Sequence, residues 1–370
     1  MIRRRKHFSG SYRQEDVCFL LRRLQITPTD LAAREAAIQF QEAHYSEMIG
    51  PEDRPSRERL SMFRSCLEQN GARFAADLSM LAEKLILSAR TSRLTLVSLA
   101  RAGTPVGIII RRIILQRTGW RKEDVPHYSI SVIRDRGVDL TALHHILRNS
   151  RPENIRFIDG WTGKGTIAGE LAKTLEKQLA SKGRPNPGLW VPLDISGVAI
   201  ASASREDYLI PSVLLGGTLS GLVSRSILPR KDLGRKCFHG CVELGHLRRY
   251  DLSRWFIHIM MEKVDAGGGQ AIVPKVPMTP PFFRHDARNA LGEIAREFKV
   301  MDLNWLKVGF GETVRVLLRR VPHRILIQNP QSPDARQVVQ LACRRGVEVE
   351  IRPAMFYQAV AIIKDLRNSQ

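Results

Sequence analysis

The sequence predicts an α/β protein with a mainly parallel sheet, a helical N-terminal region and a small C-terminal α/β/α domain. Strand-like and helix-like segments alternate over residues 94–265, which is typical of a parallel sheet. Helical patterns dominate residues 1–93, and a stretch rich in glycine and proline precedes the last part of the chain. We therefore divide the chain into 1–93, 94–265, a linker with one helix at 266–303, and 304–370.

The N-terminal region is expected to form a helical hood or scaffold. The segment 28–41 follows Thr27 and Thr29, either of which could cap a helix. The segment 57–87 has the pattern of one or two longer amphipathic helices.

Strands are expected near 94–99, 128–133, 154–158 and 189–202. The first of these runs directly into a loop at 100–107 and then into a helix that carries several arginines. In open parallel sheets, ligands bind beyond the carboxyl ends of the strands. This loop is therefore a candidate anion site.

A second strand, loop and helix unit carries the sequence FIDGWTGKGT at 157–166. Its glycines allow several backbone N–H groups to converge, and the N-terminus of the following helix adds positive charge, so the loop could hold a phosphate. Thr162 and Thr166 could donate hydroxyls, and Asp159 could meet ribose hydroxyls or Mg²⁺. The spacing differs from that of a Walker A loop. A glycine-rich turn that only caps the helix is the alternative.

Two charged clusters follow other strands. Arg134 and Arg136 flank an aspartate and could bind pyrophosphate through paired hydrogen bonds, although a solvated turn explains them equally well. Arg205, Glu206 and Asp207 could face the same cleft and recognise a substrate. A surface cluster of salt bridges is the alternative for these three residues.

The C-terminal part is expected to fold as a basic α/β/α sandwich. Residues 304–370 carry 11 Lys plus Arg against 5 Asp plus Glu, a surplus of +6. A domain that binds protein or docks on the core is the alternative to a nucleic-acid-binding domain. The expected elements are helices at 284–298, 314–320, 334–345 and 356–366, and strands at 324–327 and 347–351.

The net charge of the chain is +21, from 58 Lys plus Arg and 37 Asp plus Glu. Nucleic acids and phosphorylated metabolites are both suitable partners for such a surface, and a basic surface that serves only solubility is the alternative. The sequence has no apolar run of 18 residues, and its basic start lacks a following apolar region, so we expect no membrane span and no secretory signal. Five cysteines favour reduced thiols. These features predict a cytoplasmic protein, and they are compatible with an oligomer.

The two loops, SLARAGTPVG and FIDGWTGKGT, resemble the pyrophosphate loop and the phosphoribosyl pyrophosphate (PRPP) loop of type I phosphoribosyltransferases. The resemblance implies PRPP as ligand, Mg²⁺ as cofactor and transfer of the phosphoribosyl group to a nitrogen acceptor. That family usually has two adjacent acidic residues before the second loop, whereas this chain has Ile158 and Asp159. The implied catalytic residues are Asp159, with Mg²⁺, and Arg101, Arg134 and Arg136, and the implied PRPP-binding residues are Ala100, Ala102, Gly103, Thr104, Asp159, Gly160, Trp161, Thr162, Gly163, Lys164, Gly165 and Thr166.

A narrower resemblance covers most of the chain. The strings GSY, HYSEM, HYSISVIRDRG, SASREDYLIPS, SGLVSR, DLSRWF and GFGETVRVLLRR resemble a bacterial phosphoribosyltransferase-like family. Its genes accompany tellurium-resistance and stress-response genes, it has a C-terminal Pelota-type RNA-binding domain, and some members carry the label "cysteine protease StiP". The resemblance implies structured RNA as a partner, contacted by Gly309, Gly311, Glu312, Thr313 and Arg315.

Two further hypotheses remain open. The core could be a sensor that binds a nucleotide or RNA without catalysis. Cys241 could be the nucleophile of a cysteine protease, with His239 or His246 near it in sequence. A zinc site at Cys237, His239, Cys241 and His246 lacks the spacing of a common zinc finger.

Overall fold

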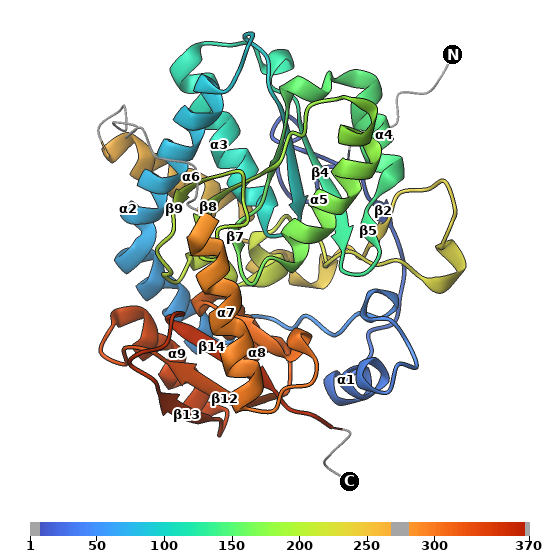
Figure 1. Ribbon diagram of the computed structural model, residues 1–370. Helices are drawn as coiled ribbons and strands as arrows, with labels where there is room; N and C mark the ends of the chain where they lie inside the picture. The colour runs from blue at the N-terminus through green and yellow to red at the C-terminus, as the bar shows by residue number, and fades with distance from the viewer. Residues whose placement is uncertain (1–7, 268–280, 367–370) are drawn as a thin grey trace.

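The computed structural model describes residues 8–267 and 281–366. A large α/β core carries a small C-terminal domain at one end, which lies at the bottom of Figure 1. The predicted fold class is confirmed, because the central sheet is almost entirely parallel and is followed by a separate small sheet. No helix within the described ranges combines the length and the apolar character that a membrane span requires.

The main sheet is built around β3 (Thr95–Ala100), which lies between β4 and β6 and is parallel to both. Five of its six residues are buried, as expected for a strand covered on both faces. Among the described strands of this sheet, only β5, a short strand beside β4, is antiparallel to its neighbour. The other strands of this sheet are β1 (Cys18–Phe19), β4 (His127–Ile133), β5 (Gly137–Val138), β6 (Ile155–Ile158), β7 (Trp161–Thr162), β8 (Leu189–Asp194) and β9 (Ala201–Ser204).

Helices cover both faces of this sheet (Figure 1). Helices α2 (Arg57–Leu87), α3 (Gly103–Thr118) and α6 (Ser253–Ala266) pack together on one face, where they share one hydrophobic core. Helices α4 (Leu140–Asn149) and α5 (Thr166–Gln178) cover the other face over a second core. The ends of the strands remain available for loops.

The N-terminal region is only partly helical. Helix α1 (Leu31–Gln39) begins after Asp30, whose carboxylate accepts hydrogen bonds from the first turn, so Asp30 caps the helix rather than Thr27 or Thr29. The predicted segment 57–87 is the single helix α2. Strand β1 extends the main sheet, and β2 (Arg22–Arg23) pairs with β10 (Gly240–Cys241). These short strands tie the region to the core.

The C-terminal domain is an α/β/α sandwich whose layers differ from the predicted ones. Its sheet has the order β11 (Leu306–Val308), β14 (Ala359–Ile363), β12 (Pro322–Ile327) and β13 (Glu348–Ile351). One face packs against α7 (Pro281–Glu297), and the other against α8 (Phe310–Arg319) and α9 (Pro333–Arg344).

Two element predictions are wrong. The helix expected at 356–366 is replaced by β14, which is fully buried between two partner strands. A short apolar run fits a buried strand and a buried helix equally well, and only its neighbours decide between them. The strand expected at 189–202 is two parallel strands, β8 and β9. The glycine- and proline-rich part of the predicted linker lies outside the described residues.

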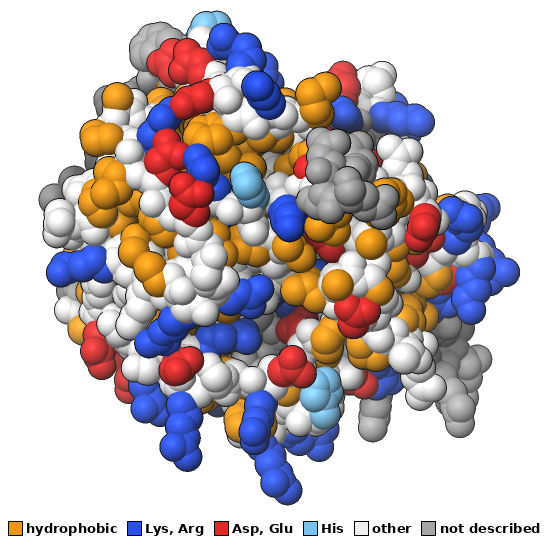
Figure 2. Space-filling view, turned by 90° about the horizontal axis from the view of Figure 1, so that it is seen from below, with side chains coloured by type: hydrophobic (Ala, Val, Ile, Leu, Met, Phe, Trp, Pro, Cys, Tyr) orange, Lys and Arg blue, Asp and Glu red, His pale blue; other side chains and the backbone are white. Residues whose placement is uncertain are grey.

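The C-terminal domain is packed firmly on the core. The backbone N–H of Phe310, at the start of α8, donates to the Asp207 carboxylate at 3.1 Å. Asn70 of α2 donates to Asp334 at 2.7 Å. Apolar residues of α8 and α9 belong to the same hydrophobic cluster as those of α2 and α3. Figure 2, the view from below, shows many Lys and Arg side chains on this end of the molecule.

Candidate ligand-binding site

The two loops singled out in the sequence lie against each other at the carboxyl edge of the sheet. A Cβ atom on Gly103 would lie 2.5 Å from the carbonyl oxygen of Ile158, and one on Gly160 would lie 3.3 Å from that of Ala102. The backbones can approach this closely only because Gly103 lacks a side chain. The neighbouring strands β3 and β6 therefore deliver both loops to one place.

A cavity of about 550 Å³ opens beside these loops. Its walls come from the core, from the N-terminal region around α1, and from α8 of the C-terminal domain. Of the residues that the structure describes, four acidic ones line it, namely Glu52, Asp53, Asp159 and Glu312. The cations among the described lining residues are ten, namely Arg34, Arg101, Arg134, Lys164, Arg225, Lys307, Arg315, Arg319, Arg320 and Arg345.

The positive charges are crowded and incompletely balanced. Burial, with repulsion from neighbouring cations, lowers the pKa of Lys307 to about 7 and that of Arg319 to about 9. Burial is also the main cause that lowers the pKa of Lys164 to about 8. A ligand with several negative charges would relieve this repulsion, so the cavity is suited to a polyanion.

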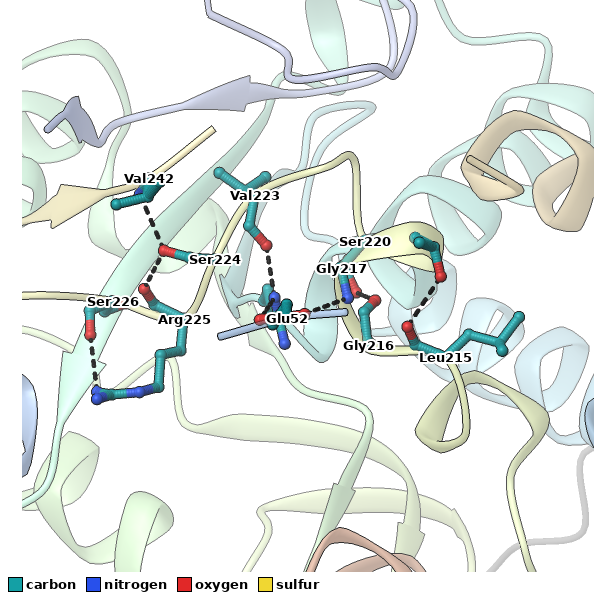
Figure 3. Close-up of polar contacts among 12 residues, drawn as sticks. Glu52, Leu215, Gly216, Gly217, Ser220, Val223, Ser224, Arg225, Ser226 and Val242 are labelled. Carbon is teal, nitrogen blue, oxygen red and sulfur yellow. Dashed lines mark hydrogen bonds and ion pairs between the residues drawn. The ribbon is translucent and has the colours of Figure 1, made fainter. Parts of the chain in front are cut away.

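Arg101, from the first loop, is held by Glu52. Its Nη1 atom lies 2.6 Å from Glu52 Oε1 and donates to the carbonyl oxygen of Val223 at 2.7 Å. Glu52 also accepts the N–H of Gly217 at 3.0 Å (Figure 3). Burial opposes ionisation of Glu52, but the charges of Arg101 and Arg319 outweigh it and lower its pKa to about 2. These contacts fix the position of the Arg101 guanidinium.

The other residues of the first loop have structural partners. Gly103 and Thr104 are buried, and Thr104 Oγ1 lies 2.8 Å from the Ser129 hydroxyl. The Ala100–Arg101 peptide bond is cis. Of the five residues predicted here, only Arg101 and Ala102 line the cavity.

The second loop contributes more of its length. Asp159 and all residues from Trp161 to Thr166 line the cavity. Gly165 has a φ of +91° and precedes the first turn of α5, which begins at Thr166. The Thr162 hydroxyl is occupied, because it donates to Asp194 at 2.6 Å. The Lys164 ammonium group is partly occupied as well, since it donates to the carbonyl oxygen of Leu303. Phosphate contacts from this loop would therefore come chiefly from its backbone and from the remaining donors of Lys164.

Asp159 differs electrostatically from the cations around it. One oxygen accepts the N–H of Gly160 at 2.8 Å. Burial raises its pKa to about 7, in spite of the nearby charge of Arg315. The carboxyl group therefore titrates near neutral pH.

The structure places Arg134 and Arg136, which the sequence analysis assigned to one site, in different surroundings. Arg134 lines the cavity, and its guanidinium lies 5.0 Å from the centre of the Tyr45 ring. Arg136 does not line it. Its guanidinium forms an ion pair with Glu47 and donates to the carbonyl oxygen of Leu228 at 2.9 Å, so it fastens the N-terminal region to the core.

Arg205, Glu206 and Asp207 do not line the cavity, contrary to the shared cleft that the sequence suggested. Glu206 pairs with Arg73, and Arg205 lies over the ring of Phe283. Asp207 caps α8. All three connect elements of the fold.

The turn and first helical residues of the C-terminal domain face the core. Gly309, Gly311 and Thr313 are buried, and a Cβ atom on Gly311 would lie 3.3 Å from the Trp161 ring. Glu312 and Arg315 line the cavity. This turn is therefore covered by the core and is not exposed to solvent.

Cys241 lies outside the cavity and is fully buried in β10. Burial raises the pKa of its thiol to about 12. His239, two residues away, is bonded through its ring to the Ser131 hydroxyl at 2.8 Å. The described residues that line the cavity include no cysteine and no histidine, and no cluster of metal ligands occurs in the described ranges.

Several residues of the cavity were not predicted. Arg34, Glu52 and Lys307 come from distant parts of the chain and carry no motif of their own. Arg225 and Arg319 fall within the strings SGLVSR and GFGETVRVLLRR, so the family resemblance contained a signal for them.

Comparison with known proteins shows the family. The family described as "Tellurite-like stress resistance cysteine protease StiP" matches residues 10–261. The chain belongs to the StiP family. A curated relative from Acinetobacter baylyi, named "Cysteine protease StiP", is 36% identical over 97% of this chain and 95% of its own length. The family described as "PELOTA RNA binding domain" matches residues 285–365.

A solved structure described as a hypothetical protein from Neisseria gonorrhoeae with bound ppGpp aligns with 33% of this chain and 65% of its own. Its identity is 15% and its TM-score is 0.20. A likeness at this level carries no argument about the fold or the ligand of this chain.

Proposed function

We propose that the cavity binds PRPP and transfers its phosphoribosyl group to a nitrogen acceptor. The observation that carries the proposal is the meeting of two strand, loop and helix units at a cavity whose described lining includes ten cations and Asp159. Sugar phosphates and diphosphates are the metabolites that such a surplus of positive charge would attract.

In the proposed reaction, the bond from the sugar C1 to the pyrophosphate oxygen breaks, and its electron pair leaves with pyrophosphate. A bond forms between C1 and the acceptor nitrogen, which loses a proton. The chain would act by positioning the reactants and by stabilising charge. Lys164 and the 162–166 backbone would hold the 5-phosphate, while Arg101 and Arg319 would lie near the pyrophosphate.

Mg²⁺, when bound with PRPP, would reduce the charge of the diphosphate. Such a site usually combines one or two carboxylates with phosphate oxygens and water. Asp159 could supply one carboxylate, because its second oxygen has no hydrogen-bond partner among the described residues. The residues present therefore fit a metal ion that arrives with its ligand.

Isothermal titration calorimetry with PRPP and Mg²⁺ tests the binding step. We expect the wild-type protein to bind, and Asp159→Asn to weaken binding by about tenfold or more, as for a lost hydrogen bond to a charged group. A pyrophosphate-release assay with a panel of nitrogen bases then tests transfer. Absence of PRPP binding would contradict the proposal, and binding without release would favour a non-catalytic sensor.

Cysteine proteolysis is the second candidate, because the family and the curated relative carry that name. The buried Cys241 thiol, with its raised pKa, is a poor nucleophile, since the thiolate is the reactive form. The matched variant Cys241→Ala is therefore expected to bind PRPP within about twofold of wild type, a change of under 0.5 kcal/mol. Loss of a protease activity in this variant, with PRPP binding intact, would support proteolysis instead.

RNA binding is a further activity that we propose for residues 285–365, on the strength of the match to a Pelota RNA-binding domain. The turn around Gly309 is covered by the core. RNA would therefore contact the exposed arginines of α9, Arg336 and Arg344, while the domain remains docked.

A further inference from the structure

The C-terminal domain supplies one of the carboxylates of the cavity. Asp159 follows β6 in the core, whereas Glu312 lies in the first turn of α8. The other two acidic residues differ from this pair, because Glu52 is engaged with Arg101 and Asp53 is exposed. Asp159 and Glu312 are thus the acidic groups of the cavity to consider as ligand contacts.

Glu312 is held firmly against the second loop. Its Oε1 atom accepts hydrogen bonds from Arg315 at 2.7 Å and from the indole N–H of Trp161 at 3.3 Å. A Cβ atom on Gly163 would lie 3.1 Å from Glu312 Cγ. Burial opposes its ionisation, but Arg315 and Lys307 outweigh that effect and lower its pKa, so the carboxylate is charged.

Each of the two carboxylates keeps one oxygen available. Asp159 Oδ1 accepts the N–H of Gly160, and both protein hydrogen bonds to Glu312 end on Oε1. Within residues 8–267 and 281–366, Asp159 Oδ2 and Glu312 Oε2 have no hydrogen-bond partner. The negative charge of Glu312 also raises the pKa of Asp159, which indicates that the two groups are close.

Ionised carboxylates only accept hydrogen bonds. Besides a metal ion at Asp159, this pair can therefore bind hydrogen-bond donors, and a ligand that brings such donors must also bring negative charge to the surrounding cations. A ribose phosphate has both, because its neighbouring 2- and 3-hydroxyls can each donate one hydrogen bond. A 2-deoxyribose phosphate has the same charge but lacks one donor.

We propose that Glu312 is a ligand-binding residue, which together with Asp159 accepts hydrogen bonds from the two ribose hydroxyls. The inference rests on the proposed function and deepens it, since it adds a second acidic residue to the ribose site. It also makes the C-terminal domain part of the binding site.

The test compares ribose 5-phosphate with 2-deoxyribose 5-phosphate by isothermal titration at pH 8. We expect wild type to prefer ribose 5-phosphate by about tenfold or more, the usual effect of a hydrogen bond to a charged group. Glu312→Gln should lose most of this preference and bind the deoxy compound within about twofold of wild type. The exposed control Glu293→Gln should retain the preference.

Three results separate the failures. Equal weakening of both ligands in Glu312→Gln would indicate a structural role and overturn the inference. If Glu312→Gln kept the preference of wild type for ribose 5-phosphate, the inference would be overturned as well. In either case, binding of PRPP by wild type would leave the proposed function intact. Binding of neither sugar phosphate nor PRPP by wild type would overturn the proposed function itself.

A second variant covers the case in which Glu312→Gln does not fold. Trp161→Phe removes the N–H that positions Glu312 Oε1, together with part of the indole ring, and keeps a smaller aromatic ring against Gly311. We expect a smaller loss of the ribose preference, by about threefold, because Arg315 still holds Glu312 Oε1 in this variant. An unchanged preference in this variant would contradict the inference.

Discussion

Asp159 illustrates how much the surroundings of one residue matter. The sequence placed a carboxyl group at the end of a strand, where it could meet ribose or a metal ion. The structure adds that burial raises its pKa to about 7, whereas the cations around Glu52 lower the pKa of that carboxyl to about 2. Two acids in one cavity therefore behave oppositely near neutral pH.

The raised pKa predicts a pH dependence of ligand binding. An ionised Asp159 accepts hydrogen bonds better than a protonated one, so the affinity of wild type for ribose 5-phosphate, relative to that of Asp159→Asn, should rise from pH 6 to pH 8. Titration of a single group with a pKa of about 7 gives an increase of about tenfold over this range. Isothermal titration at several pH values measures it.

The control for this prediction is Asp159→Asn. The ligand phosphate and Lys307, whose pKa is lowered to about 7, titrate in the same range in both proteins. The difference between the two pH profiles therefore reports Asp159. If the affinities of wild type and Asp159→Asn changed in parallel with pH, the role of Asp159 as a ligand contact would be contradicted.

At the scale of elements, α8 decides how the two domains meet. Its first turn donates the N–H of Phe310 to Asp207, and its next residues reach Trp161 and the cavity. A helix N-terminus favours a carboxylate partner. Burial nevertheless raises the pKa of Asp207 to about 7. The contact between the domains is therefore sensitive to pH.

The sign of this sensitivity follows from proton linkage. Because the folded-state pKa of Asp207 lies above its ordinary value of 3.8, the folded protein holds a proton that the unfolded chain has released. The stability due to this proton is present at low pH and is lost as pH rises from about 4 to about 7. The free energy of unfolding should fall accordingly.

Asp207→Asn tests this prediction, because the amide oxygen still accepts from Phe310 but does not titrate. Relative to the variant, wild type should lose about 1 to 3 kcal/mol of unfolding free energy between pH 4.5 and 7.5. Urea denaturation at both pH values measures the change. The control Asp286→Asn changes an exposed residue and should lose the same unfolding free energy as wild type over this pH range. An equal loss in Asp207→Asn would contradict the prediction.

At the scale of the whole molecule, the net charge of +21 is distributed over two kinds of surface. Part of it lines the cavity, where three domains or regions contribute cations. Part of it lies on exposed helices such as α9. A polyanionic small ligand would therefore contact the positive charges of the cavity, and a nucleic acid would contact those on the exposed helices.

The exposed part predicts RNA binding that depends on salt. We expect a hairpin RNA to bind the full chain more weakly as salt rises, because phosphate contacts release counterions. Replacing Arg336 and Arg344 by alanine should reduce the salt slope by about two, one per contact. Fluorescence anisotropy over a salt series measures this slope.

The matched control replaces Arg148 and Arg151, which are exposed and flank the end of α4. This pair should leave the salt slope within error of wild type. If both double substitutions reduced the salt slope equally, the result would indicate only a general attraction of RNA to a basic surface.

Local patterns in the sequence were sufficient for most elements of the core. Strand β3, the loop after β6 and helix α5 were predicted because their apolar spacing and glycines are local features. Strand β14 was not predicted as a strand, since its short apolar run depends on β11 and β12 for its hydrogen bonds. Arg136 and Asp207 were assigned to a site, but they serve the packing of distant segments.

The sequence by itself determined the fold class, the two loops and the surplus of positive charge, because each depends on residue types at short spacing. Only the tertiary structure decided which of these residues share a cavity. Glu52 and Glu312 are 260 positions apart in the printed numbering, yet both line it. Their meeting depends on the docking of the N-terminal region and the C-terminal domain on one sheet edge, and such long-range packing has no signature in local spacing.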